Sequence, residues 1–222
     1  DETSIYNLLN HKYHLKKINS KNKINPKKIK NKGTIVYDTH NIFLNISLWT
    51  NLNKKIKIIN VERHPVNLIY SWYKKGFGNF KHSPISQILL YKYKKKLVPY
   101  YALKWKNKYI KMAEMDRIIN IIYELIKKSN LEYKKFKDKK KILRLKYENI
   151  LDNPLNTLKK VDKFLNYRSK IFFSRYSSKV NTKKKISNSI ILRKLSYIKK
   201  KASKDSHKKI HELIYLYSRY NF

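Results

Sequence analysis

The stretch that decides the fold is residues 55–78, KIKIINVERHPVNLIYSWYKKGFG. Its first part is rich in isoleucine and valine and has the length and β-branched composition of a buried strand. Arg63 and His64 end this apolar run, and Pro65 has the fixed φ and the missing N–H that suit the first turn of a helix. Apolar residues then recur at three- and four-residue spacing, which predicts an amphipathic helix that closes near Gly76. The sequence therefore predicts a strand, a charged turn and a helix.

Arg63 is a candidate phosphate ligand at the end of this strand. Only seven of the 54 basic residues are arginines, so a position that needed a positive charge alone would be expected to hold lysine. A guanidinium binds two phosphate oxygens at once, which an ammonium cannot do. Ser71 follows in the helix and offers a hydroxyl to the same anion, in a region where open α/β sheets bind ligands. The alternative is that Arg63 caps a neighbouring carbonyl and Ser71 faces solvent.

The composition predicts one globular domain over residues 1–222, with 41% hydrophobic and 14% aromatic residues. No Met precedes Asp1, so the true amino end could lie upstream. Cysteine is absent, which excludes disulfides and thiolate metal sites and favours a reducing compartment, here taken to be the cytoplasm. No apolar run has the length of a membrane span.

The formal net charge of +40 has two interpretations. Such a charge attracts polyanions, and a nucleic-acid-binding protein that uses its basic surface and its 19 tyrosines is one hypothesis. The other interpretation is a compositional bias in which lysine fills most exposed positions. The lysines are spread along the whole chain and form no confined tail, which favours compositional bias, and nucleic acid is not the expected partner.

A second block, residues 142–165, repeats the pattern of a strand that leads into a helix: ILRLKYENILDNPLNTLKKVDKFL. Its apolar strand ends in Tyr147-Glu148, and a short loop then leads to Asn153-Pro154. Apolar residues at helical spacing follow the proline, which predicts a second amphipathic helix. The two blocks lie about eighty residues apart in the chain, and the block with Arg63 comes first.

The Arg63-x-Pro65 pattern with Ser71 resembles the 3′-phosphate-binding motif of the sulfotransferase family, which uses 3′-phosphoadenosine 5′-phosphosulfate (PAPS). The block at 142–165 resembles a later segment of the same family, and the resemblance covers the chain to about Leu165. It implies an α/β fold of three layers, with a central, mostly parallel sheet flanked by helices as in P-loop proteins. It also implies transfer of a sulfuryl group from PAPS to a hydroxyl acceptor, with a carbohydrate as the first guess and no metal.

The resemblance also assigns roles near the amino end. Thr3 and Ser4 correspond to the hydroxyl residues of the loop that binds the 5′-phosphosulfate, although Glu2 stands where the family has glycine. His40, which precedes Arg63 by 23 residues, corresponds to the general base, and Asp38 replaces the family's lysine. From the residues alone, Thr3 and Ser4 could equally cap a helix, and His40 could be a hydrogen-bonded turn residue.

Two further cofactor-binding residues follow from the same resemblance. Tyr147 corresponds to a tyrosine that packs near the adenine, and its alternative is a buried tyrosine whose hydroxyl needs a partner. Arg193, beside Lys194, is the candidate for the basic segment that touches the 3′-phosphate near the carboxyl end. The departures at Glu2 and Asp38 leave open a domain that holds the nucleotide without transferring sulfate.

Other patterns complete the expected fold. A short strand is expected at 34–38, a buried helix at 42–49, a hairpin over 88–101 with its turn at Lys94–Lys96, and a long helix within 105–128. His207 and His211 lie four apart in the last helix, which is a spacing found at metal sites. No third ligand accompanies them, so they are interpreted as surface residues.

Overall fold

The computed structural model describes residues 42–52, 55–80, 90–166 and 187–219 of the chain. All of them belong to one compact unit over residues 41–222. The predicted strand at 34–38 and the candidate residues Thr3, Ser4 and His40 lie outside the described residues. The assignment of the whole chain to a single domain therefore stays a prediction.

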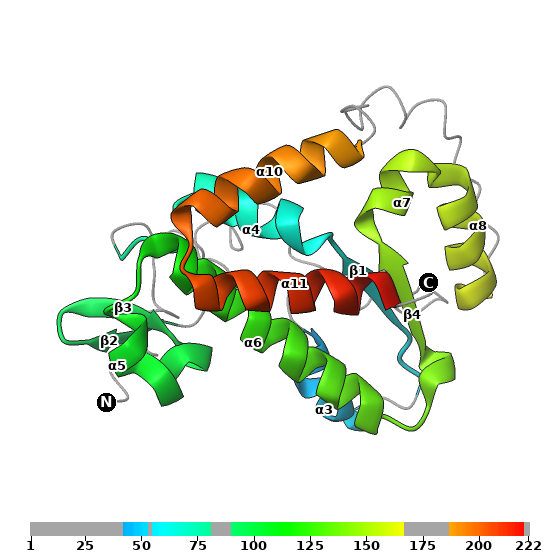
Figure 1. Ribbon diagram of the computed structural model, residues 1–222. Helices are drawn as coiled ribbons and strands as arrows, with labels where there is room; N and C mark the ends of the chain where they lie inside the picture. The colour runs from blue at the N-terminus through cyan, green and yellow to red at the C-terminus, as the bar shows by residue number, and fades with distance from the viewer. Residues whose placement is uncertain (1–41, 53–54, 81–89, 167–186, 220–222) are drawn as a thin grey trace, which may run out of the picture. The chain divides into compact units, whose positions relative to one another are not determined.

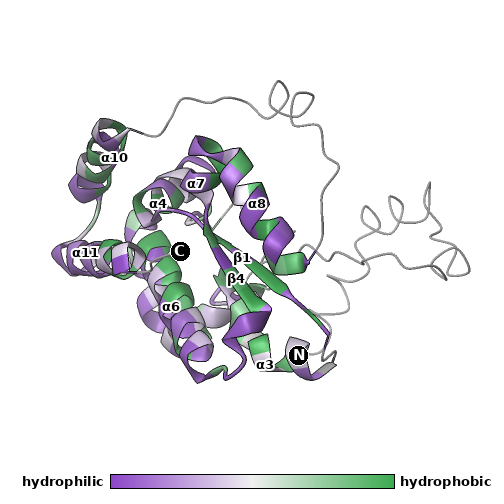
Figure 2. Ribbon diagram, turned by 90° about the vertical axis from the view of Figure 1, so that its right-hand side faces the viewer, coloured by the Kyte–Doolittle hydropathy of each residue, from purple (hydrophilic) through white to green (hydrophobic). Residues whose placement is uncertain are grey.

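A parallel pair of strands forms the base of the candidate site. Strand β1 (Ile58–Glu62) pairs with β4 (Ile142–Lys146), and the register sets Glu62 beside Lys146 (Figures 1 and 2). Both strands therefore end at the same edge, where each of the two sequence blocks turns into a helix. The prediction of an α/β fold with parallel pairing is confirmed, although the described part of the chain is mostly helical and its parallel sheet has two strands.

A helix starts directly after each of these strands. Helix α4 (Pro65–Lys74) begins with its proline in the first turn, and the chain leaves it through Gly76 at a φ of 69°, as the sequence predicted. Helix α7 (Tyr147–Asp152) begins where a short loop was predicted, which corrects that interpretation. Asn153 then caps α8 (Pro154–Leu165), because its side chain accepts a hydrogen bond from the Asn156 amide at 3.2 Å.

The single long helix predicted within 105–128 is wrong in its bounds. The helical region is interrupted between Tyr109 and Glu114. Arg117 accounts for this interruption, because its guanidinium donates to the Met112 carbonyl and, from Nε at 2.6 Å, to the Gly78 carbonyl. These bonds hold the intervening turn and tie the loop after α4 to the next helix. The observed elements are η3 (Tyr100–Trp105), α5 (Lys106–Tyr109) and α6 (Glu114–Lys135).

The predicted hairpin is confirmed, and the segment before β1 differs slightly from its prediction. Strands β2 (Leu90–Tyr93) and β3 (Lys96–Pro99) pair antiparallel around Lys94 and Lys95. The helix expected at 42–49 starts as a 3₁₀ turn. The described residues before Asn166 also form η2 (Ile42–Asn45), α3 (Ile46–Leu52) and η4 (Lys139–Lys141).

The apolar core fixes the position of α4 relative to the carboxyl-terminal helices. Helix α10 (Asn188–Lys201) packs against α4, and α11 (Lys204–Arg219) runs alongside α6 (Figure 1). Four elements contribute fully buried side chains to this one cluster: Val66, Ile69, Ile118, Ile119, Ile122, Ile198, Ile210 and Leu213. Removing such apolar surface from water is the main stabilising term of the fold. It holds the start of α4 in place between α10 and α11.

Candidate functional site

The last residue of β1 is engaged across the sheet. The Glu62 carboxylate accepts hydrogen bonds from Arg144 Nε on β4 at 2.7 Å and from Asn60 Nδ2 at 2.8 Å. Burial raises the pKa of Glu62, while Arg144 acts to lower it. The Glu62 carboxylate therefore forms its ion pair with Arg144 and not with Arg63, the next residue in the chain.

Arg63 is the first residue after β1 and lies beside Tyr147, the first residue after β4. Its guanidinium lies over the Tyr147 ring, with Cζ 5.3 Å from the ring centroid. Its Nε is buried and has no hydrogen-bond partner within the described part of the chain. A buried donor without a partner costs free energy, so an anion that accepts its hydrogen bond would be bound favourably. The two residues that follow β1 and β4 thus form a cation stacked on an aromatic ring.

Glu148, next to Tyr147, is bound by donors from two other helices. Its two carboxylate oxygens accept from the backbone N–H of His64, at 3.1 and 3.2 Å. Asn67 Nδ2 donates to it at 3.3 Å, and the Tyr217 hydroxyl of α11 donates at 2.7 Å. The carboxylate therefore lies at the start of α4, where sequence reasoning expected only a bound anion.

A second basic side chain reaches the same place from α10. Lys194 Nζ donates to Asn67 Oδ1 at 2.7 Å, and Asn67 is fully buried. Burial lowers the pKa of Lys194, and the positive charges of Arg63 and Arg193 lower it further, against an opposing effect of Glu148. Lys194 on α10 is thus bound to a buried asparagine and lies close enough to Arg63 and Arg193 for their charges to act on it.

The predicted site residues are brought together to different degrees. Tyr147 contacts the Arg63 guanidinium, and Arg193 is close enough to influence the neighbouring lysine electrostatically. Ser71 is half-buried two helical turns beyond the start of α4, and no hydrogen bond joins it to Arg63 in the described residues. The roles assigned to Thr3, Ser4 and His40 fall on residues that are not described.

His64 occupies the turn between β1 and α4, and its ring is partly buried. Burial lowers the pKa of His64; Glu148 opposes this effect, and Lys146 and Lys194 reinforce it. The ring packs edge-on against Tyr217 with centroids 5.1 Å apart, and its Nδ1 is buried without a partner among the described residues. The sequence suggested a charged turn, whereas the structure favours the neutral imidazole next to Arg63.

Sequence reasoning gave no role in the site to three residues of this network: Glu148, Asn67 and Tyr217. One available signal was that Glu148 is one of only 14 acidic residues in a chain with 54 basic ones, and that it follows a strand end. A rare acidic side chain at the end of a strand indicates that hydrogen-bond donors of the protein bind it there. Nothing in the sequence pattern around Asn67 or Tyr217 distinguishes them from other polar and aromatic residues of amphipathic helices.

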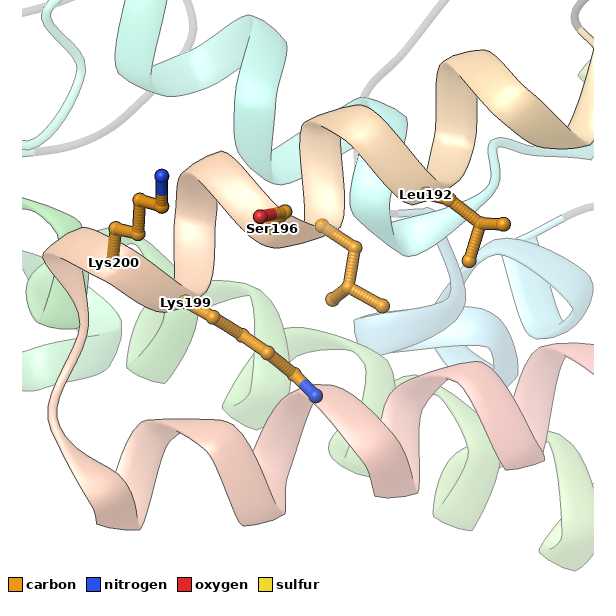
Figure 3. Close-up of a pocket in the computed structure, with 5 residues that line it drawn as sticks. Leu192, Ser196, Lys199 and Lys200 are labelled. Atoms are coloured by element: carbon orange, nitrogen blue, oxygen red, sulfur yellow. The ribbon is translucent and has the colours of Figure 1, made fainter.

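A surface hollow of about 430 Å³ lies against α10 and is separate from these residues (Figure 3). Lys199 points from it toward α11, and all the lining residues come from the one helix: Leu192, Leu195, Ser196, Lys199 and Lys200. Neither Arg63 nor Tyr147 contributes to it. It therefore adds no chemistry to the candidate phosphate site.

The described residues contain no group of three or more His, Asp or Glu side chains that could hold a metal ion. The ring of His207 interacts with the Lys199 carbonyl at 2.9 Å between Nε2 and oxygen, and His211 is exposed. Among the helices of the described segments, none combines the length and the apolar character needed to cross a bilayer.

The comparisons with known proteins agree with the two sequence blocks. A family model described as "Sulfotransferase domain" matches residues 4–214, which is nearly the whole chain. No curated protein and no solved structure matched the chain.

Proposed function

The chain belongs to the sulfotransferase domain family, and on that premise we propose that it transfers a sulfuryl group from PAPS to a hydroxyl acceptor, with Arg63 as the anchor of the 3′-phosphate. The family consists of PAPS-dependent transferases, so the protein is an enzyme of that class. The observation that carries the Arg63 assignment is its buried Nε, which has no partner among the described residues, at the shared edge of β1 and β4.

The residues at this edge fit a nucleotide that carries a phosphate on its ribose. Arg63 supplies a guanidinium, and Lys194 and Arg193 add positive charge beside it. Tyr147 offers an aromatic surface on which a base can stack. Bound PAPS would supply the activated sulfuryl group, and anchoring its remote phosphate would use binding energy to align the reacting end.

The remaining steps rest on the assignments made by resemblance. Thr3 and Ser4 hold the 5′-phosphosulfate by their hydroxyls and amides, and Ser71 adds a hydroxyl to the 3′-phosphate site. His40 takes the proton from the acceptor hydroxyl on an imidazole nitrogen as the oxygen attacks sulfur. The bond between sulfur and the 5′-phosphate oxygen of PAPS would break in the same step, with adenosine 3′,5′-bisphosphate as the leaving group, and alignment in the bound state lowers the barrier. Arg193 is a second basic ligand of the 3′-phosphate. The proposed acceptor is a carbohydrate hydroxyl, because a basic wall suits polar and acidic glycans.

Titration calorimetry with adenosine 3′,5′-bisphosphate tests the anchor. Arg63→Ala should raise the dissociation constant at least tenfold, because one charge-assisted hydrogen bond contributes about 1.5–3 kcal/mol. The matched control is Arg219→Ala, since Arg219 also stacks on a tyrosine at 5.3 Å but lies at the end of α11. Equal affinity in the wild type and Arg63→Ala would refute the assignment.

A transfer assay on the same proteins separates an active enzyme from a domain that only holds the nucleotide. Radiolabelled PAPS is offered with carbohydrate and small-alcohol acceptors. Label transfer by the wild type and its loss in Arg63→Ala support the proposed reaction. Nucleotide binding without transfer to any member of the panel would favour the alternative raised by Glu2 and Asp38.

A further inference from the structure

Glu148 poses an electrostatic problem for a phosphate site. It is an acidic side chain within a cluster of cations, and by charge alone it repels the anion that Arg63 is proposed to bind. It nevertheless accepts from the His64 N–H, from Asn67 and from Tyr217, so its oxygens are used for contacts within the protein. This set of donors indicates what the carboxylate does there.

The first consequence concerns the peptide that follows Arg63. The His64 N–H belongs to the peptide bond that leaves Arg63, and both Glu148 oxygens lie within 3.2 Å of its nitrogen. Because a peptide unit is planar, fixing this N–H also fixes the direction in which the chain leaves Arg63. After the neighbouring strand β4, Tyr147 precedes Glu148 in the chain and its ring lies against the guanidinium. One carboxylate therefore holds together the two turns that present the cation and its ring.

The second consequence concerns α11. The Tyr217 hydroxyl reaches Glu148 from the last turns of this helix, while the Tyr217 ring packs against His64 and lies 4.9 Å from Lys146 Nζ. Burial, together with the bond to Glu148, raises the pKa of Tyr217, so the hydroxyl keeps its proton and acts as the donor. Tyr217 lies outside residues 4–214, which the family model matches.

A third contact extends the network to α10. Asn67 donates to Glu148 from Nδ2 and accepts from Lys194 on Oδ1, so it transmits the position of the carboxylate to a basic side chain. The chain of contacts runs from Tyr217 through Glu148 and Asn67 to Lys194 and crosses four helices. All the side chains in it are at least half-buried, which makes the geometry costly to change.

We propose that Glu148, held by Tyr217, is a positioning residue that sets Arg63 for the 3′-phosphate of the nucleotide. This inference rests on the proposed function, because it concerns the same phosphate site. Glu148 does not touch the nucleotide in this account. It acts through the peptide after Arg63 and through Asn67, and the carboxyl-terminal helix takes part in nucleotide binding by supplying the Tyr217 hydroxyl.

Glu148→Gln gives opposite results under the two explanations. If Glu148 only contributes charge, the variant binds adenosine 3′,5′-bisphosphate more tightly, because a negative charge has been removed. If Glu148 positions Arg63, the variant binds about tenfold more weakly, since one acceptor oxygen becomes an NH₂ donor facing the His64 N–H. Tyr217→Phe, a milder change, should weaken binding about threefold.

Adenosine 5′-phosphate, which lacks the 3′-phosphate, shows whether an effect is specific to the 3′-phosphate site. Glu148→Gln and Tyr217→Phe should weaken adenosine 5′-phosphate much less than the bisphosphate, because this ligand lacks the phosphate that Arg63 is proposed to bind. A general loss of structure would weaken both ligands equally. In an Arg63→Ala background, Glu148→Gln should cause a smaller loss than in the wild type, because the part of its effect that passes through the guanidinium is missing. The control is Glu212→Gln, since Glu212 also accepts from a tyrosine hydroxyl, that of Tyr123, at 2.6 Å.

The outcomes separate the inference from the function on which it rests. Wild-type protein that does not bind the bisphosphate, or Arg63→Ala that binds it unchanged, overturns the proposed function. If Arg63→Ala weakens binding but Glu148→Gln and Tyr217→Phe bind as tightly as the wild type or more tightly, the positioning role is overturned and the 3′-phosphate anchor stands. Equal weakening toward both nucleotides also overturns it.

Discussion

Arg63 and Glu148 follow adjacent strands and carry opposite charges, yet they do not neutralise each other. Glu148 is engaged by His64, Asn67 and Tyr217, and Glu62 is engaged by Arg144. Each carboxylate near the site is thus bound by a donor other than the Arg63 guanidinium. This division of partners explains how Arg63 can keep a buried donor for an anion although Glu62 precedes it in the chain and Glu148 lies just after the neighbouring strand.

His64 carries the pH dependence that belongs to this turn. Its pKa is lowered by burial, so between that value and the ordinary 6.5 the unfolded chain takes up a proton that the folded chain does not. The contribution of His64 to stability is therefore present above pH 6.5 and is lost as the pH falls through this window. His64→Gln should lose less free energy of unfolding than the wild type between about pH 7.5 and 5.5.

Urea denaturation at the two pH values measures this difference. The control is His211→Gln, because His211 is exposed on α11 and has no packed environment to lose. The control should follow the wild type, since the other titrating groups are common to all three proteins. An identical pH dependence in His64→Gln and the wild type would show that the imidazole is not held neutral by its surroundings.

At the scale of elements, the sequence allowed the strand–turn–helix units to be predicted but not their exact ends. Pro65 and Gly76 fix the two ends of α4 by their backbone preferences, and both were readable from the sequence. The break before α6 was not readable, because it depends on Arg117 reaching the Gly78 carbonyl, 39 residues away in sequence. Helical spacing alone continues across the break, since apolar residues recur at three- and four-residue intervals on both sides of it.

The turn of the β2–β3 hairpin has an unfavourable backbone conformation for the residues that it contains. Lys94 and Lys95 have φ values of 46° and 62°, in the left-handed region that side chains with a Cβ disfavour. Two such residues in a row form the turn that Asn-Gly adopts most readily. Lys94→Asn combined with Lys95→Gly should raise the free energy of unfolding by about 1 kcal/mol.

Loss of two positive charges would also stabilise a chain of net charge +40, so a charge-matched control is needed. The double variant Lys94→Gln and Lys95→Gln removes the same charges and keeps the unfavourable backbone conformation. Its gain in urea denaturation should be smaller than that of the Asn-Gly variant. Equal gains would show that charge, and not turn geometry, limits the stability of the hairpin.

At the scale of the whole molecule, the high charge is distributed and the specific chemistry is local. Of the 54 basic side chains, the proposed phosphate site uses three, which are Arg63 after β1 and Arg193 and Lys194 on α10. The family and the Arg63 block could be recognised from the sequence because strand ends and prolines are local signals. The contacts of Glu148 could not be recognised in this way, because Asn67 and Tyr217 lie 81 and 69 positions away from it in the sequence, respectively.

A crystal structure with adenosine 3′,5′-bisphosphate tests the central claim most directly. It should show the 3′-phosphate within hydrogen-bond distance of the Arg63 guanidinium, with the Arg63 Nε no longer without a partner. A bound nucleotide whose 3′-phosphate lies away from Arg63 would contradict the account.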